Sequence, residues 1–159
     1  MKVHFLRAIC MDLDGDPIRY PLISKKYKVL KHGPLSLALA NALAGDDGFF
    51  CRGDVMNHMK LLFQRGTSFP SHEQTEVGRW DHRDSCEEKF DFPVADDMYY
   101  AWVDPDHWDY DPHCVLYTKE EFMTLFEDCC RNYVAAHPDR AEEFGAALAA
   151  NGMSLKSEV

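Results

Sequence analysis

The chain has 159 residues, of which 46% are hydrophobic, and this is enough for one domain with a sizeable core. Its formal net charge of −10 argues against a nucleic-acid-binding protein, because the phosphate backbone is bound through Lys and Arg. The sequence has no apolar run of about 18 residues and no N-terminal apolar stretch typical of a signal peptide, so we expect a cytoplasmic protein that does not enter a membrane.

Two β-strands are predicted at the start of the chain. Residues 2–13 and 18–23 are rich in Val, Ile, Leu, Phe and Tyr, and the segment between them places Gly15 between two aspartates. This pattern is typical of a β-hairpin with a tight turn.

Two short helices are predicted next. The first spans residues 34–44, with leucines four residues apart, and ends before Gly45. The second begins after Asp54, a residue type that favours the N-cap, and continues to Arg65. Apolar residues recur on one face of each segment, so both helices are predicted to be amphipathic.

The middle of the chain is predicted to contain a loop and then three strands. Residues 67–83 are polar and rich in turn-forming residues, which indicates an exposed loop. Strands are predicted at residues 89–94, 98–103 and 113–117, because aromatic and aliphatic residues gather there between Asp-, Pro- and His-rich segments.

Two more helices are predicted at the C-terminal end. Thr118 and Glu121 form a capping box before an apolar stripe at helical spacing, and a last helix opens at Pro138 and closes at Gly152. The sequence has no repeat and no clear domain boundary. Residues 1–159 are therefore predicted to form a single α+β domain, in which a largely antiparallel sheet packs with about four short helices.

The charge is concentrated in one segment. Residues 81–111 contain eleven Asp and Glu against two Lys and Arg, a net charge of −9, whereas residues 1–80 carry a net charge of +3. A segment with this charge favours a basic partner.

The motif DLDGD after the first apolar run has three interpretations. It resembles the first motif of haloacid-dehalogenase-like phosphatases, D-x-D-G-T, with Asp12 as nucleophile and Asp14 as general acid, but Asp16 replaces the Thr. It does not fit a calcium-binding EF-hand loop, because the sixth position is Pro17 instead of Gly. A hairpin turn is the preferred interpretation, and the phosphatase remains an alternative.

No metal site or cofactor is predicted. Residues 104–114 are rich in His, Asp and Cys, but these side chains lack the paired spacing of zinc ligands. The six cysteines include no C-x-x-C pair and are predicted to be buried apolar residues. The common nucleophile, phosphate-binding and dinucleotide-binding motifs are absent from the sequence, and no enzyme activity is expected.

The acidic segment also contains large aromatic residues, which supply binding area at low entropic cost. About half of these aromatics are expected to fill the core, and the others, with the acids, to form an interface. The predicted partner-binding residues lie between positions 96 and 111 and are Asp96, Asp97, Trp102, Asp104, Asp106, Trp108, Asp109, Tyr110 and Asp111.

The last 70 or so residues resemble a known family. The relevant stretches read EKFDFPVADDMYYAWVD and VLYTKEEFMTLFEDCCRNYVAAHPDRAEEFGAALAANG, and they are similar to immunity proteins that protect bacteria from contact-dependent and other polymorphic toxins, notably ribonucleases. The resemblance implies a protein that binds and neutralises a cognate basic toxin domain. Its pattern positions are structural, so it assigns no toxin-binding residue.

The acidic field has two further interpretations. It is equally expected of an acidic nucleic-acid mimic and of an adaptor surface, because composition does not distinguish these from a toxin inhibitor. The sequence leaves the oligomeric state open.

Overall fold

The part of the chain described by the computed structural model comprises residues 22–27, 31–43, 54–72 and 74–156. The predicted N-terminal hairpin lies outside these residues except for the end of its second strand. That end, Leu22 and Ile23, forms a buried bend instead of a strand.

Side chains of helix α3 (Lys119–Ala136) hold this bend in place. The buried carboxylate of Asp128 accepts hydrogen bonds from the backbone N–H and the hydroxyl of Ser24, both at 2.7 Å. The amide of Asn132 donates to the carbonyl oxygen of Leu22 at 2.8 Å. Because helix side chains bind these groups, the strand predicted at residues 18–23 is wrong over its described end.

Both helices predicted in the first half are confirmed, with ends within two residues of those expected. Helix α1 spans Gly33–Leu43 and α2 spans Val55–Phe63. Asp54 occupies the N-cap of α2 but makes no capping hydrogen bond with its side chain, and its Oδ2 lies 3.4 Å from Nε2 of His58. Gly66 follows with φ of 69°, a left-handed conformation common after helix ends.

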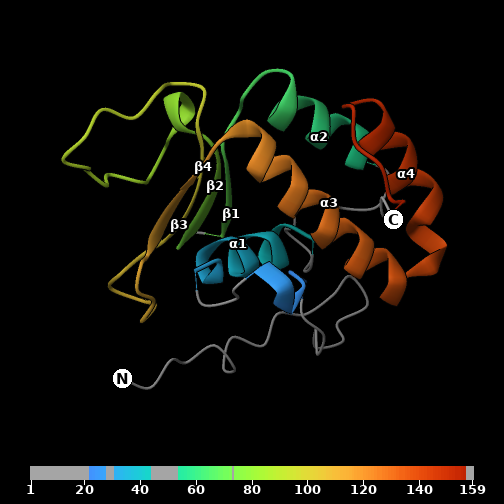
Figure 1. Ribbon diagram of the computed structural model, residues 1–159, viewed down its shortest axis with the longest axis horizontal. Helices are drawn as coiled ribbons and strands as arrows, with labels where there is room; N and C mark the ends of the chain where they lie inside the picture. Colours follow the sequence, from blue (N-terminus) through green and yellow to red (C-terminus); the bar gives the residue numbers. More distant parts are fainter. Residues whose placement is uncertain (1–21, 28–30, 44–53, 73, 157–159) are drawn as a thin grey trace.

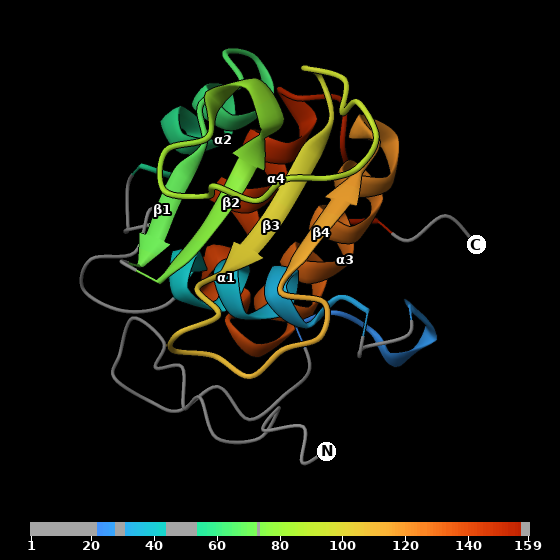
Figure 2. The same cartoon turned by 90° about the vertical axis from the view of Figure 1, so that its left-hand side faces the viewer.

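Four antiparallel strands form one sheet in the order of the sequence (Figure 2). They are β1 (Phe69–His72), β2 (Thr75–Arg79), β3 (Tyr99–Val103) and β4 (Cys114–Tyr117). The strands predicted at residues 98–103 and 113–117 are confirmed as β3 and β4.

The hairpin of β1 and β2 corrects the prediction of an exposed loop at residues 67–83. Strand β2 pairs with β1 on one side and with β3 on the other, so that Thr75 faces Val103 and Arg79 faces Tyr99. Thr75, Glu76 and Val77 are all buried. The polar sequence conceals this strand because its burial depends on partners far along the chain.

The strand predicted at residues 89–94 is wrong as well. This segment has no strand pairing in the structure and belongs to a long loop, residues 83–98, that crosses the outer face of the sheet (Figure 2). Its apolar residues Phe90 and Val94 pack against that face. Packing by side chains therefore replaces the backbone pairing that the composition suggested.

The C-terminal helices are confirmed. Thr118 caps α3 with both hydrogen bonds of a capping box. Its hydroxyl oxygen accepts the N–H of Glu121 at 3.1 Å, and its own N–H donates to the Glu121 carboxylate at 2.9 Å. A short 3₁₀ turn η3, Pro138–Arg140, leads into α4, Ala141–Ala149. Gly152, with φ of 75°, follows the end of α4.

The sheet separates two apolar regions. Helices α1 and α3 lie on its inner face (Figure 1), where Tyr99 and Ala101 join the main core. The alternate residues Tyr100 and Trp102 point to the outer face, beneath the 83–98 loop. All five residues of β3 are buried, because both faces of the sheet are covered.

The result is a small α+β fold with an antiparallel sheet, as predicted. Within the described ranges, no helix combines the length and apolar character required to cross a membrane.

Candidate protein-binding surface

The connection between β3 and β4, residues 104–113, is organised by Asp104. Its Oδ1 accepts the N–H of Asp106 at 2.9 Å, and its Oδ2 lies 3.0 Å from Nδ1 of His107. The backbone N–H groups of His107 and Trp108 donate to its carbonyl oxygen. The hydrogen bond from the N–H of Asp106, and then that from His107, lower the pKa of the Asp104 carboxyl.

The other acids of this connection face solvent. Asp106, Asp109 and Asp111 are exposed, and no Lys or Arg of the described chain forms an ion pair with them. Trp108 and Tyr110 lie among them, half-buried, with ring centroids 6.5 Å apart. Neither aromatic belongs to the two apolar clusters of the described core. This loop thus combines unpaired carboxylates with accessible aromatic surface.

Asp96 and Asp97 lie elsewhere, at the opposite end of β3. They are exposed in the turn that precedes the strand, and the carbonyl of Asp96 accepts the N–H of Asp81 at 3.2 Å. The five residues of β3 separate them from Asp104, which at about 3.3 Å per residue is a distance of roughly 20 Å. The predicted surface is therefore divided into two acidic parts.

The prediction that Trp102 belongs to the partner-binding surface is wrong, because its side chain is buried. It is 7% exposed and packs with Trp80 and Tyr100 in the outer-face cluster. It is the fourth of the five residues of β3, and on the outer face it shares an apolar cluster with Cys86, Phe90 and Val94 of the 83–98 loop. A partner does not reach its ring unless that loop moves.

The 83–98 loop is held to the sheet by Glu76 of β2, which is fully buried. Its carboxylate accepts three backbone N–H groups, from Asp84 at 2.6 Å, Ser85 at 2.8 Å and Cys86 at 2.9 Å, and the hydroxyl of Tyr100. Burial, and then the hydrogen bond to this carboxylate, raise the pKa of Tyr100. One buried side chain thereby fixes the start of the acidic loop.

A row of contacting aromatic rings extends from the sheet to the exposed side of this loop. Trp80 packs edge-on against Phe90 with centroids 5.7 Å apart, and Phe90 contacts Phe92 at 5.2 Å. Phe92 is 53% exposed. On the other side, the guanidinium of Arg83 lies 3.7 Å from the centroid of the Trp80 ring. Phe92 is thus a large apolar side chain presented to solvent within the acidic segment.

The sequence did not identify Glu76 or Phe92 as important. Glu76 stands alone in a polar stretch and resembles any surface acid, so no local signal marks it. The sequence pattern predicts a strand at Phe92. Asp91 before it and Pro93 after it disfavour strand pairing, and they are the signal that could have indicated a loop.

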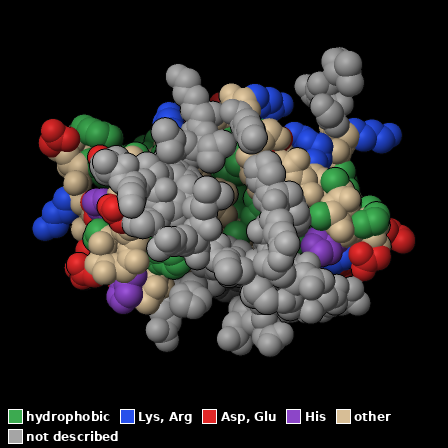
Figure 3. All heavy atoms as spheres, turned by 90° about the horizontal axis from the view of Figure 1, so that it is seen from below, with side chains coloured by type: hydrophobic (Ala, Val, Ile, Leu, Met, Phe, Trp, Pro, Cys, Tyr) green, Lys and Arg blue, Asp and Glu red, His purple; other side chains and the backbone are tan. Residues whose placement is uncertain are grey.

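Exposed acids predominate on the loops around the sheet. Nine of the eleven Asp and Glu residues at positions 81–111 are exposed, and Glu88 and Asp104 are half-buried. Arg79 pairs with Asp81 at 2.5 Å and reduces this field locally. Three His side chains also lie beside acids of the segment, His82 at 3.9 Å from Asp81, His107 at 3.0 Å from Asp104 and His113 at 2.5 Å from Glu88. Acidic and His side chains are visible at this end of the molecule, at the left of Figure 3.

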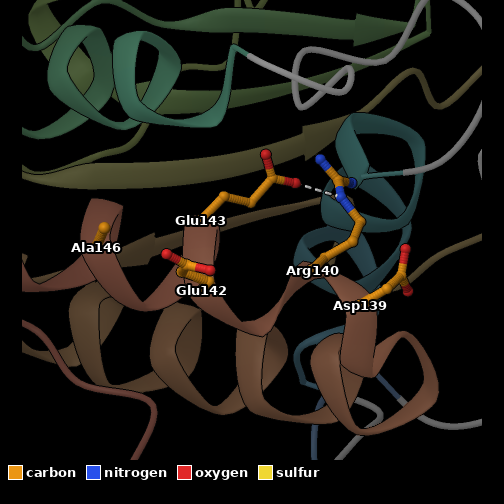
Figure 4. Close-up of a pocket in the computed structure, with 5 residues that line it drawn as sticks. All are labelled: Asp139, Arg140, Glu142, Glu143 and Ala146. Atoms are coloured by element: carbon orange, nitrogen blue, oxygen red, sulfur yellow. Dashed lines mark hydrogen bonds and ion pairs between the residues drawn. The ribbon is translucent and has the colours of Figure 1, made fainter.

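A separate hollow of about 510 Å³ lies against η3 and α4 and is shown in Figure 4. Its lining residues are Asp139, Arg140, Glu142, Glu143 and Ala146. Arg140 is 3% exposed, pairs with Glu143 at 2.5 Å and donates to the hydroxyl of Tyr133 at 2.9 Å. These contacts join α4 to α3, so we assign the hollow a structural role.

The predicted phosphatase residues Asp12 and Asp14 lie outside the described residues. In the described part of the chain, no group of three or more His, Cys, Asp and Glu side chains is placed to hold a metal ion, and this includes the His- and Asp-rich stretch 104–114.

Comparisons of this chain with protein-family models, with curated proteins and with solved structures found no match. The charge and geometry of the described surface are therefore the basis for a functional proposal.

Proposed function

We propose that this protein is an immunity-type inhibitor, a non-catalytic protein that binds a basic toxin domain, specifically a nuclease, and neutralises it. One observation carries the proposal: nine exposed acids lie on the loops around the sheet between residues 81 and 111, and only Arg83 and Lys89 oppose them in that segment. The resemblance of the C-terminal sequence to immunity proteins supports the same direction.

The physical argument starts from what a nuclease must present. Its active site attracts nucleic-acid phosphates through Lys and Arg, so a concentrated field of carboxylates competes for the same groups. Such a field steers association, with rate constants that reach about 10⁸–10⁹ M⁻¹s⁻¹ at low salt. The carboxylates of Asp106, Asp109 and Asp111 then take the place of substrate phosphates.

Aromatic side chains supply the apolar component that a stable complex requires. Phe92 is exposed, and Trp108 and Tyr110 are half-buried, so all three retain surface for a partner. Binding energy in interfaces is concentrated on a few aromatic and Arg side chains surrounded by polar contacts. The local hydrogen bonds of Asp104 order the loop as far as Trp108, which reduces the entropy lost on binding.

The direct test uses the protein encoded by the neighbouring gene as the candidate partner. The C-terminal domain of that partner and the full chain of the present protein are purified separately, mixed at low salt and analysed by gel filtration. A ribonuclease assay is run on the same mixture. We expect a complex and loss of nuclease activity, and association that slows as the salt concentration rises. Absence of a complex at low salt contradicts the proposal.

Two charge-matched double variants locate the interface. Asp106→Asn with Asp109→Asn removes two charges from the β3–β4 loop, whereas Asp139→Asn with Glu142→Gln removes two from the region of α4, away from the sheet (Figure 1). The loop pair should slow association by about three- to tenfold and flatten its salt dependence, and the α4 pair should leave both nearly unchanged. If both pairs slow association equally, the effect comes from the net charge of the protein, and the β3–β4 loop is not the interface.

A further inference from the structure

Two buried cysteines of the outer-face cluster come from different elements. Cys86 belongs to the 83–98 loop and is 4% exposed, and Cys114 begins β4 and is 7% exposed. The thiols of the two side chains interact through a hydrogen bond. The two sulfur atoms are therefore neighbours within one apolar cluster.

The sheet register places Cys114 on the face that the loop covers. Glu76 faces Trp102 across β2 and β3, and Trp102 faces Cys114 across β3 and β4, so the three side chains project from the same face. The N–H of Cys86 donates to the carboxylate of Glu76 at 2.9 Å. Backbone geometry thus brings both cysteines to the same side of the sheet.

A second contact fixes the loop on the other side of the cysteines. Glu88 lies two residues after Cys86, and its Oε1 is 2.5 Å from Nε2 of His113, the residue before Cys114. The loop is consequently attached to the sheet on both sides of the cysteine pair. The fold therefore holds the two segments that carry the cysteines next to each other.

The environment distinguishes the two thiols chemically. The hydrogen bond with Cys114 lowers the pKa of the Cys86 thiol. The same hydrogen bond, and then burial, raise the pKa of the Cys114 thiol. Cys86 lies on the covering loop and Cys114 on strand β4 of the sheet, so we assign Cys86 as the thiol that reacts first and Cys114 as the group that resolves a mixed disulfide.

We propose that Cys86 and Cys114 form a reversible dithiol–disulfide site that reacts with small-molecule disulfides such as oxidised glutathione. The Cys86 thiolate attacks one sulfur of the small disulfide, forms a mixed disulfide and releases one thiolate. Cys114 then gives its proton to the first released thiolate and attacks the Cys86 sulfur, which forms the Cys86–Cys114 bond and releases the second thiolate. The small disulfide gains the two electrons that the protein loses.

The bond attaches the acidic loop covalently to β4. This inference does not depend on the toxin-binding proposal, because it concerns only the two thiols and the elements that carry them. In the oxidised protein the 83–98 loop cannot separate from the outer face of the sheet, and residues 87–113 become part of a closed ring that raises resistance to unfolding.

Peptide mapping of the folded full chain tests the proposal. The reduced protein is incubated with oxidised glutathione, remaining thiols are alkylated, and trypsin is added. Cleavage after Arg83, Lys89 and Lys119 separates the two cysteines, so the bond appears as a linked pair of peptides, 84–89 with 90–119. We expect this pair to be the main disulfide among the described cysteines and dithiothreitol to reverse it. Recovery of both peptides only in alkylated form overturns the proposal.

Two variants separate the roles of the thiols. In Cys114→Ala, peptide 84–89 should carry glutathione as a stable mixed disulfide, because the resolving thiol is absent. Cys129→Ala is the matched control, since Cys129 is buried in the main core and should leave the yield of the linked pair unchanged. If Cys114→Ala does not fold, the wild-type map still decides. Equal linkage of Cys86 to several cysteines also overturns the proposal.

Discussion

The attachment of the acidic loop by Glu76 is open to a direct test through Glu76→Gln. The substitution keeps the size of the side chain but replaces one of its two acceptor oxygens by an NH₂ group. In the wild-type protein, Oε1 accepts the N–H of Asp84 and the hydroxyl of Tyr100, and Oε2 accepts the N–H groups of Ser85 and Cys86. Either orientation of the amide therefore sets its NH₂ against at least one backbone N–H donor, the part-buried N–H of Asp84 or those of Ser85 and Cys86.

The cost follows from the number of hydrogen bonds affected. One backbone donor left without an acceptor costs about 1–3 kcal/mol, and the bonds that remain lose the assistance of the carboxylate charge. For a fully buried site this amounts to a loss of about 3–4 kcal/mol, a large fraction of the 5–15 kcal/mol typical of a small domain.

Urea unfolding followed by tryptophan fluorescence measures this loss, because Trp80 and Trp102 lie in the cluster beneath the loop. Hydrogen exchange reports where the change occurs, and we expect the amides of residues 84–86 to lose protection more than those of α3. Glu120→Gln is the matched control, since Glu120 is exposed and should change stability by no more than about 0.5 kcal/mol. A loss below about 1 kcal/mol for Glu76→Gln, with unchanged exchange, refutes the attachment by Glu76.

Two further outcomes are expected. Gly78→Ala should destabilise the protein by about 1–3 kcal/mol in the same urea assay, because the added Cβ lies 2.3 Å from the Cα of Ser68; a neutral effect contradicts the close packing of β2 on the residue that precedes β1. Burial, and then the charge of Lys31, lower the pKa of His32 from 6.5, so the unfolded state takes up the proton first and stability should fall as the pH drops below 6.5. His32→Gln should reduce this slope between pH 7.5 and 5.5, and an unchanged slope shows that other groups cause it.

The helices of the described fold were predictable from sequence. Leucines four residues apart mark α1, and Thr118 with Glu121 marks the start of α3, because the interactions that favour these helices join residues three or four positions apart. The location of the negative charge is likewise a property of composition, and residues 81–111 carry it in the structure as they do in the sequence.

The candidate surface was predictable only in part. Asp106, Asp109 and Asp111 are exposed as a loop rich in Asp and Pro suggests. The burial of Trp102 was not predictable, because the local sequence pattern around a strand tryptophan is the same whether its face of the sheet is exposed to solvent or covered. Here the 83–98 loop covers it, and no pattern within β3 reports the position of that loop.

By itself, the sequence determined the helical segments, the capping of α3 and the acidic character of residues 81–111, since each arises from neighbouring residues or from composition. Only the tertiary structure decided that residues 69–79 form a hairpin, that Glu76 is a buried acceptor and that Cys86 meets Cys114. Although the paired residues of β1 and β2 are only three to eight positions apart, the other contacts join groups 8 to 28 positions apart, which are brought together by the pairing of β2 with β3 and by one buried carboxylate. Such contacts leave no periodicity in the sequence, because their energy is gained only when the whole sheet and its covering loop are assembled.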